Sequence, residues 1–466
     1  MANSRKSSSN LAGRVADALS SCVPHGSSLL IGLSGGIDSV VLLHLLAQIS
    51  PRFSWQLRAL HVHHGISRHA DAWAAFCSEL CAQHGIPLQV EHVDITPLRE
   101  MGIEAAARQL RHAALARQNS DFIALAHHRD DQAETLLLQL LRGAGVRGAS
   151  AMPLIKRVAQ HTPSPLAGEG WGEGAKISPV LLRPLLDVDR AELEAYAHEH
   201  GLRWVEDDSN ADVSYPRNFL RHRVLPLLEQ RFPAYRTTLA RSSRHFAEAA
   251  SLLDELAAQD AVAAIAGERL AVAVLRQLSD ARGKNLLRYF LAMRGAPIPD
   301  STRLAEMLRQ LCAAGADAQP CVSWAGWQLR CYREHAYVLP EALPACDFSV
   351  TWQGEVEIAL PASHGVLSFE PVTGLGISRH KLEQARLEIR PRHGSESIQP
   401  GAARPHRSLR NLLQEHGVPP WQRELLPLLF CGDELVCVPG VAIAAAYQAQ
   451  AGEAGIVVAW RSGRVD

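Results

Sequence analysis

The residues most suited to chemistry lie in one short stretch, residues 34–39, which reads SGGIDS. Gly35 and Gly36 let the backbone adopt conformations that a side chain would forbid, and they let a bulky anion come close. A carboxylate beside a phosphate is repulsive unless a cation lies between them, so Asp38 implies a Mg²⁺ ion. The stretch is therefore expected to bind a phosphorylated ligand and Mg²⁺. The expected contacts are Ser34, Gly35, Gly36, Ile37, Asp38 and Ser39.

The sequence on either side of this stretch fits a phosphate-binding loop. Residues 29–33 have the length and composition of a buried parallel strand, and apolar residues from Val41 to Ile49 recur at helical spacing. The N–H groups that open such a helix face a bound anion with the positive end of the helix dipole. A Walker A loop is excluded, because it needs four residues between its glycines and a Lys after the second. A plain turn is the alternative, but SGGIDS in this setting resembles the pyrophosphate loop of the ATP pyrophosphatases, which split ATP into AMP and pyrophosphate.

A second polar motif, residues 126–143, reads AHHRDDQAETLLLQLLRG. Asp131 and Glu134 are three residues apart, so on a helix they project from one face near its N-terminus. Taken alone, these acids could merely complement the helix dipole. Their chemical role depends on whether they meet the SGGIDS loop.

The order of the predicted elements brings the two motifs together. After the first strand and helix, predicted strands and helices alternate at residues 56–63, 70–84, 88–95, 103–117, 122–126 and 130–142. This alternation predicts an α/β fold with a doubly wound parallel sheet, in which ligands bind beyond the carboxyl ends of the strands. His61 and His127 follow the second and fourth strands and are candidate ATP contacts. Zinc at His61, His63 and His64 is disfavoured, because these residues lack the Cys or carboxylate partners of a closed site.

Length and composition limit the class of protein. A chain of 466 residues with 47% apolar residues should form about three domains. No apolar run approaches the roughly 20 residues needed to cross a bilayer, so we expect a soluble cytoplasmic protein without membrane contact. Nine cysteines include no CxxC pair, which argues against a disulfide framework or a zinc site.

The rest of the chain separates into regions of different character. Residues 162–175 are rich in Pro and Gly and are predicted to be a flexible insertion. Residues 218–309 have helical patterns, residues 320–350 have β character, and residues 351–466 suggest a small α/β or β-rich module. We expect a catalytic domain at 1–217, a mainly helical middle domain at 218–350 and a C-terminal domain at 351–466.

Arginines are concentrated just after the predicted catalytic domain. Seven lie between Arg217 and His245, against one acid, Glu229, although the net charge of the whole chain is only −1. A solvated helix face usually carries mixed charges that pair along the helix, and one acid cannot pair seven arginines. The segment is therefore a candidate phosphate-binding surface.

Together, these motifs resemble those of the tRNA(Ile)-lysidine synthetase family, over nearly the whole chain. The resemblance rests on SGGIDS, HHRDDQAET with LLRG, RPLL at 183–186, EDDSN at 206–210 and YPRNFLRHRVLP at 215–226. Near the C-terminus, RPRHG at 390–394, residues 407–429 and LVCVPG at 435–440 also match. The resemblance implies that ATP and lysine convert the wobble cytidine of a CAU-anticodon isoleucine tRNA to lysidine. The cytosine C2 oxygen attacks the α-phosphate and releases pyrophosphate, and lysine then displaces AMP at C2.

The resemblance also implies roles for individual residues. Asp38, through Mg²⁺, would neutralise the leaving pyrophosphate. Asp131 and Glu134 would bind the lysine ammonium and accept its proton. Arg108 and Arg111 would hold the α-phosphate or the activated base. For Arg183, a structural role explains the motif as well as a functional one. The residues expected to bind tRNA are Arg217, Arg221, Arg223, Arg390, Arg392, Arg404, Arg407 and Arg410.

Two other functions are compatible with parts of the sequence, and so is a homodimer. Another ATP-pyrophosphatase enzyme, a tRNA thiolase, would typically need a catalytic CxxC pair, which this sequence lacks. A non-catalytic tRNA-binding protein with a retained fold is the other alternative, against which the intact SGGIDS and DDQAET motifs argue.

Overall fold

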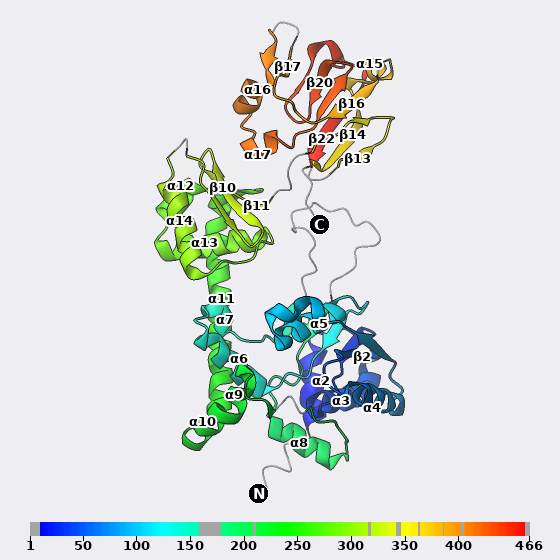
Figure 1. The fold of residues 1–466 in the computed structure, drawn as a ribbon, viewed down its shortest axis with the longest axis vertical. Coiled ribbons are helices and arrows are strands. Elements are labelled where there is room, and N and C mark those ends of the chain that lie inside the picture. Colours follow the sequence, from blue (N-terminus) through cyan, green and yellow to red (C-terminus); the bar gives the residue numbers. More distant parts are fainter. Residues whose placement is uncertain are drawn as a thin grey trace. The chain divides into compact units, whose positions relative to one another are not determined.

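The computed structural model describes residues 10–157, 179–207, 211–315, 318–341, 346–361, 364–384, 386–401 and 405–461 (Figure 1). The chain forms two compact units, Met1–Glu255 and Leu256–Asp466. The predicted insertion at 162–175 lies outside the described residues. The boundaries expected after residues 217 and 350 stay a prediction. Among the described residues, no helix is both long and apolar enough to span a bilayer.

The first unit is built on a six-stranded sheet in the order β3-β2-β1-β4-β6-β5. Its strands are β1 (Ser28–Gly32), β2 (Gln56–His63), β3 (Leu88–His92), β4 (Phe122–Ala124), β5 (Ile155–Arg157) and β6 (Val180–Leu182). All neighbouring pairs are parallel except β5 with β6. The chain moves outward from β1 to β3 and then returns to place β4 on the other side of β1, so the strand order reverses between β1 and β4. Such a switch point opens a crevice at the carboxyl ends of the strands.

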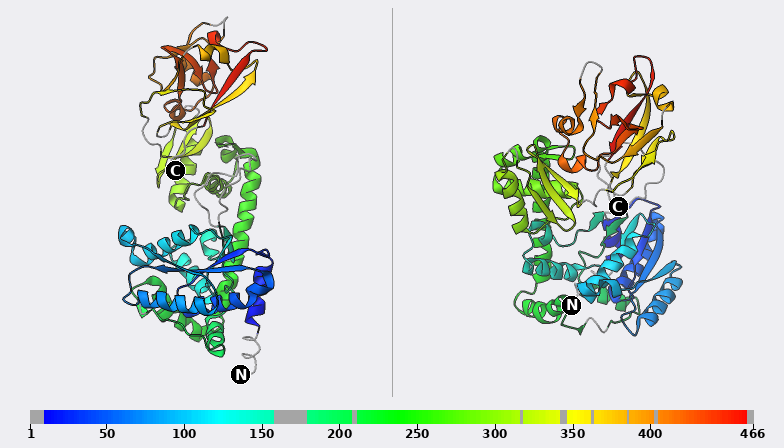
Figure 2. Two further views of the ribbon diagram at one scale, coloured as in Figure 1. Left: turned by 90° about the vertical axis from the view of Figure 1, so that its right-hand side faces the viewer. Right: turned by 45° about the horizontal axis from the view of Figure 1, so that its top comes forward.

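Helices cover both faces of this sheet (Figure 2). Leu29 and Ile31 of β1 point into a large core formed with helices α2, α3, α4 and α8, whereas Leu30 points into a smaller core with α5. This alternation follows from the two-residue period of a strand. The helices of the unit are α2 (Leu11–Ser20), α3 (Ile37–Phe53), α4 (Ala70–Gln83), α5 (Ile103–Ala116), α6 (Arg129–Leu141), α7 (Val146–Ala149) and α8 (Arg190–Glu199).

A run of shorter helices follows the sheet and contains the arginine-rich segment. These are α9 (Pro216–Phe219), a π-helical turn η3 (Leu220–Val224) and α10 (Leu225–Arg231), followed by the long α11 (Tyr235–Ala264). The stretch Pro216–Arg231 is called the arginine segment below. A small apolar cluster of Ala133, Leu225 and Tyr235 packs α6 against α10 and α11.

The second unit combines helices with antiparallel sheets. Its helices α12 (Val272–Gln277), α13 (Asp280–Met293) and α14 (Ser301–Ala313) share a core with strands β8 to β11. Together with β7 they form a five-stranded sheet in the order β7-β8-β11-β10-β9. Its strands are β7 (Ile265–Ala266), β8 (Arg269–Ala271), β9 (Cys321–Trp324), β10 (Trp327–Tyr332) and β11 (His335–Pro340). The hairpin β7–β8 interrupts an otherwise helical stretch and completes the sheet predicted from the β character of residues 320–350.

The C-terminal part of this unit is rich in β-structure. One sheet has the order β12-β16-β19-β20-β21 and a second has the order β13-β14-β22-β15. Their strands are β12 (Val350–Thr351), β13 (Glu357–Ala359), β14 (Val366–Thr373), β15 (Ile377–Ser378), β16 (Leu387–Arg390), β19 (Leu428–Cys431), β20 (Glu434–Val438), β21 (Ala442–Ile443) and β22 (Ala454–Arg461). Short helices α15 (Arg379–Glu383), α16 (Leu409–Glu415) and α17 (Pro420–Arg423) complete this part. The predicted fold class, a doubly wound parallel sheet followed by an all-α middle domain and a small α/β or β-rich module, is confirmed, except that the helical middle also contains the sheet β7-β8-β11-β10-β9.

Candidate active site

The SGGIDS loop connects β1 to α3 at the switch point. Gly36 is the N-cap of α3, and the hydroxyl of Ser39 donates to the carbonyl of Gly36 at 2.9 Å. The Ser39 hydroxyl also accepts from the backbone N–H of Ser34 at 3.2 Å. The serines therefore fold the loop around the open N-terminus of α3, where backbone N–H groups and the helix dipole favour an anion.

Gly35 is required by the shape of this loop. Its φ of 87° lies in the left-handed region that favours glycine. A Cβ at this position would come within 2.9 Å of Val205 Cγ2 and 3.2 Å of the Cys77 sulfur. The backbone N–H of Val205 also donates to the carbonyl of Gly35 at 3.0 Å. Contacts with α4 and with the segment that follows α8 thus hold the loop in place.

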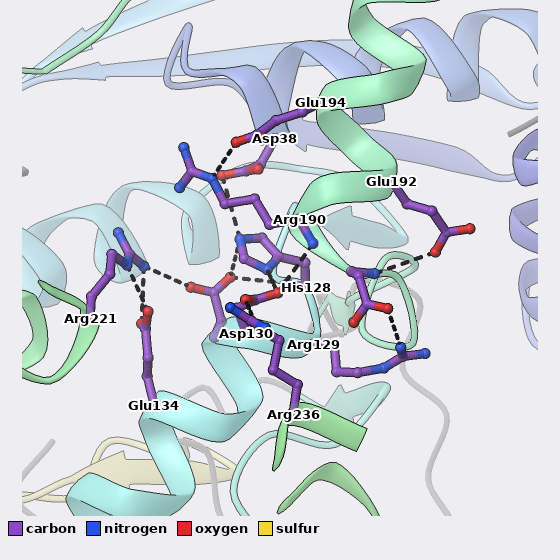
Figure 3. Close-up of polar contacts among 12 residues, drawn as sticks. Asp38, His128, Arg129, Asp130, Glu134, Arg190, Glu192, Glu194, Arg221 and Arg236 are labelled. Carbon is purple, nitrogen blue, oxygen red and sulfur yellow. Dashed lines mark hydrogen bonds and ion pairs between the residues drawn. The ribbon is translucent and has the colours of Figure 1, made fainter. Parts of the chain in front are cut away.

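His128 is the centre of the charged cluster beside the loop (Figure 3). It is the N-cap of α6, and its side chain is only 1% exposed. Its Nε2 lies 3.7 Å from Asp38 and 3.4 Å from Asp131, and its Nδ1 lies 3.5 Å from Asp130. Burial opposes a charged imidazole, but the surrounding carboxylates outweigh it and raise the pKa of His128. His128 thus links the loop to the acids of α6.

Asp38 has the character of a cation ligand. Its Oδ1 is buried and has no hydrogen-bond partner among the described residues. Burial is the largest influence on the pKa of Asp38 and raises it, and the charge of Asp131 acts in the same direction. His128, Arg190 and Arg221 oppose this shift. No group of three or more His, Cys, Asp or Glu in the described ranges could hold a metal by itself. Mg²⁺ is commonly bound by one or two carboxylates together with substrate phosphates, so Asp38 suits that ion.

Asp131 and Glu134 lie on one face of α6, as their spacing predicts, and both are already paired with the arginine segment. Arg217 donates to Asp131 at 2.7 Å and to Glu134 at 2.6 Å. Arg221 donates to both oxygens of Glu134, at 2.6 and 3.0 Å. Although burial opposes ionisation, His128 and Arg217 lower the pKa of Asp131 to about 2.

These pairs change the interpretation of the arginine-rich stretch. The expectation that its arginines lack acidic partners is wrong for Arg217, Arg221 and Arg236, because the partners come from α6, outside the stretch. Charges counted along the chain omit partners that the fold brings from elsewhere. Among the described residues, Arg223, Arg231, Arg241 and Arg244 are exposed and have no ion pair with an acid, so these four keep the character of a phosphate-binding surface.

A second group of cations surrounds His127. Arg183 is buried and donates to Nδ1 of His127 at 3.2 Å and to the carbonyl of Pro153 at 2.7 Å. Burial and the charges of Arg183, Arg217 and Arg108 outweigh Asp131 and lower the pKa of His127 to about 3. The structure therefore brings Arg108 of α5 into the field of this site. Arg183 supports the end of β4 through its contacts.

Two other predicted residues lie closer to the opposite side of the loop. His61 is buried and its Nδ1 lies 2.9 Å from the carbonyl of Leu33, so it supports the chain just before the loop. Arg111 of α5 has an exposed side chain, and its charge acts on His61 and His64. The charge of its neighbour Arg108 acts on His127, and both arginines act on His112.

The basic residues predicted in the C-terminal part of the second unit differ in their surroundings. The guanidinium of Arg390 lies 4.2 Å from the centre of the Phe430 ring and donates to the carbonyl of Gly432 at 2.6 Å. Arg407 pairs with Glu415 at 2.7 Å, whereas Arg410 is exposed. Arg392 lies 3.7 Å from Glu396. The predicted tRNA contact Arg404 lies outside the described residues.

Sequence reasoning did not include four residues of the charged cluster. His128 and Asp130 belong to the HHRDD motif at the expected ligand edge and Arg236 to the arginine-rich stretch, but these three residues and Arg190 were given no role in the site. The backbone N–H of Arg190, at the start of α8, donates to Asp130 at 3.1 Å. The side chain of Arg236 at the start of α11 reaches the same carboxylate (Figure 3). Two acids close to a histidine at the start of a predicted helix were a usable signal in the sequence. The contacts from α8 and α11 depend on the fold.

Replacing Gly35 by Ala should disrupt the loop. The change combines a strained φ with close contacts to Val205 and Cys77, so both the thermal midpoint and the affinity for a fluorescent ATP analogue should fall. Gly26→Ala is the matched control, because Gly26 also has a positive φ of 78° but no atom within 4 Å of an added Cβ. We expect Gly35→Ala to lose at least ~1 kcal/mol more stability than the control. Equal losses would contradict the close packing at Gly35.

The depressed pKa of Asp131 predicts a specific acid dependence. Because the folded-state pKa, about 2, is below the usual value of about 3.9, the stabilisation is present at neutral pH and is lost as pH falls from about 4 to 2. The free energy of unfolding, from urea titrations, should therefore fall more steeply over this range for the wild type than for Asp131→Asn. Parallel pH profiles would show that the ion pairs of Asp131 do not stabilise the fold.

Comparisons with known proteins agree with this geometry. Family models match residues 7–228 as a PP-loop domain, 270–337 as a TilS substrate binding domain and 387–460 as a TilS substrate C-terminal domain. The tRNA(Ile)-lysidine synthase of Nitrosomonas europaea is 45% identical over 95% of this chain and 93% of its own length. The synthase of Aromatoleum aromaticum is 42% identical over 93% of this chain and 97% of its own length. That of Coxiella burnetii is 37% identical over 92% of this chain and 92% of its own length. These likenesses confirm the resemblance seen in the sequence: the chain belongs to the tRNA(Ile)-lysidine synthase family.

Proposed function

We propose that this protein is a ligase that joins lysine to C2 of the wobble cytidine of a CAU-anticodon tRNA(Ile), using ATP and forming an adenylated cytidine on the way. Pyrophosphate leaves in the first step and AMP in the second. The observation that carries the proposal is that His128 touches both Asp38 of the phosphate loop and Asp131 of α6, at 3.7 and 3.4 Å. The groups suited to ATP and those suited to an amine therefore form one site. The names of the relatives support the same reaction.

In the first step, the loop would bind the phosphates of ATP through the N–H groups that open α3. Asp38 would hold Mg²⁺, which fits its buried Oδ1 without a partner in the described part of the chain. That ion would supply charge neutralisation for the pyrophosphate. Arg108 and Arg111 are proposed to hold the α-phosphate or the activated base, and His61 and His127 are proposed to contact ATP.

In the second step, Asp131 and Glu134 would bind the lysine side chain. Their oxygens already accept from Arg217 and Arg221, so the lysine ammonium must compete with those guanidinium groups. The electrostatic effect of Arg221 reaches Asp38 as well as Asp131. We therefore infer an exchange of cations, in which lysine takes the carboxylates and the arginines turn toward the α-phosphate.

The same geometry bears on how lysine loses its proton. Its ε-amine has a free pKa of about 10.4 and must be neutral to attack. With a pKa of about 2, Asp131 is a weak base while it is paired with His128 and Arg217. Asp131 is better suited to orienting the ammonium. If Arg217 left the ion pair, the basicity of the Asp131 carboxylate would rise.

A cavity of 320 Å³ beside Glu134 gives room for an amino acid. Acids and arginines line it, and Leu225, Pro226 and Tyr235 add an apolar wall. A lysine molecule has this combination of charged ends and an aliphatic chain, which supports lysine as the second substrate.

The remaining expectations are also proposals. The exposed arginines of the arginine segment and the basic residues of the second unit, Arg390, Arg392 and Arg410 among them, would bind the phosphates of tRNA. Arg407 would contribute less while it is paired with Glu415. A homodimer and a cytoplasmic location stay predictions.

One assay separates this function from its alternatives. The protein is incubated with ATP, Mg²⁺, labelled lysine and the CAU isoleucine tRNA, and label in the tRNA and AMP release are followed. Lysine-dependent AMP and labelled tRNA are expected. Thiolation with a sulfur donor and no lysine label would show a thiolase, and binding of tRNA without AMP release would show a non-catalytic protein.

Single substitutions should separate the two steps. Asp38→Asn should abolish pyrophosphate release, because the loop loses its cation ligand, whereas Asp131→Asn should lower lysine transfer at least ~10-fold more than adenylation. Asp71→Asn is the control, since the Asp71 side chain is 96% exposed and lies outside the cluster. Equal loss of both steps in Asp131→Asn would show that Asp131 does not act specifically on lysine.

A further inference from the structure

Asp130 lies next to Asp131 and lines the cavity beside Glu134, but the proposed reaction gives its carboxylate no role. Its side chain is 14% exposed, and its two oxygens have different partners. Oδ2 accepts from the backbone N–H of Arg190 at 3.1 Å and lies 3.5 Å from Nδ1 of His128. Oδ1 accepts from Nε of Arg236. Burial raises the pKa of Asp130, but His128, Arg190 and Arg236 outweigh it and hold that pKa well below its usual value.

Arg236 connects this carboxylate to the arginine segment. Its Nε donates to Asp130, while its two terminal nitrogens donate to both oxygens of Glu229 at 2.6 and 3.1 Å. The guanidinium also lies 4.7 Å from the centre of the Tyr235 ring. A planar guanidinium with fixed donor directions is suited to holding two carboxylates at once. Asp130 is on α6, Glu229 on α10 and Arg236 on α11, so the group joins three helices.

The contacts of the arginine segment with α6 are of two kinds. Arg217 and Arg221 pair with Asp131 and Glu134, the carboxylates that the proposed function assigns to lysine. These ion pairs must open when the ammonium binds. The interactions that do not involve those acids include the small apolar cluster of Ala133, Leu225 and Tyr235, and the three-residue group around Arg236.

We propose that Asp130, Arg236 and Glu229 form a clamp that keeps the arginine segment docked on α6 while Arg217 and Arg221 change partners. Arg236 is thus a positioning residue for lysine transfer, an assignment that rests on the proposed function. The clamp leaves the carboxylates of Asp131 and Glu134 free to receive the substrate, because it is anchored on the preceding residue of the helix. Without it, opening the two ion pairs would also loosen the segment that carries both arginines.

The first test measures lysine transfer in Arg236→Ala. The Michaelis constant for lysine should rise at least ~10-fold, while pyrophosphate release with ATP and tRNA alone stays within ~2-fold of the wild type. Arg236→Lys should give an intermediate value, because a single ammonium cannot hold both acids in the geometry of the guanidinium. Arg117→Ala is the matched control, since it removes an ion pair with Glu91 at the far end of α5. Proportional loss of both steps, or an unchanged Michaelis constant, would overturn the clamp.

The second test needs no substrate. Hydrogen–deuterium exchange of the full chain should show faster exchange for the backbone amides of residues 216–231 in Arg236→Ala, with α3 and β1 unchanged. Exchange identical to that of the wild type would overturn the clamp, and faster exchange across the whole first unit would mean general destabilisation instead. If the wild type attaches no lysine, the proposed function fails, yet the exchange result still decides whether Arg236 docks the segment.

Discussion

The structure of the site depends on the need to compensate four acids that the fold gathers at one edge of the sheet. Asp38, Asp130, Asp131 and Glu134 are all partly or fully buried, and a buried carboxylate without a cation is strongly unfavourable. His128, Arg217, Arg221 and Arg236 supply that charge. The helices that follow the sheet are therefore bound to it by the same groups that would meet the substrates. Folding and chemistry share one set of ion pairs.

The sequence was most informative where local chemistry and hydrophobic pattern agree. The SGGIDS loop, the four parallel strands around it and the face shared by Asp131 and Glu134 all follow from short-range rules, namely strand length, helical spacing and turn composition. The family followed from motifs spread over the whole chain. The strands β6 and β5, beyond β4 in the sheet, were not predicted, because three-residue strands are too short for a periodic pattern to appear.

The sequence could not predict which residues the site residues would pair with. Arg217 and Arg221 looked like unpaired cations because their acids lie 86 and 87 positions earlier in the chain. His128 looked like one of two equivalent histidines, yet the N-cap position turns it toward three carboxylates, whereas His127 faces arginines. Opposite environments then move the pKa of these adjacent residues in opposite directions.

The packing of Gly35 against Val205 constrains how such a sequence can vary. The two residues come from distant parts of the chain, but the space beside the loop is shared between them. Because the positive φ of Gly35 and the nearby Cys77 already exclude a side chain at position 35, a smaller residue at position 205 would not admit one. Val205 can therefore occupy the space that the absent Cβ leaves, and a larger residue at position 205 would press on the backbone of the loop. The segment after α8 thus shapes the phosphate loop, although it contributes no atom to the SGGIDS motif itself.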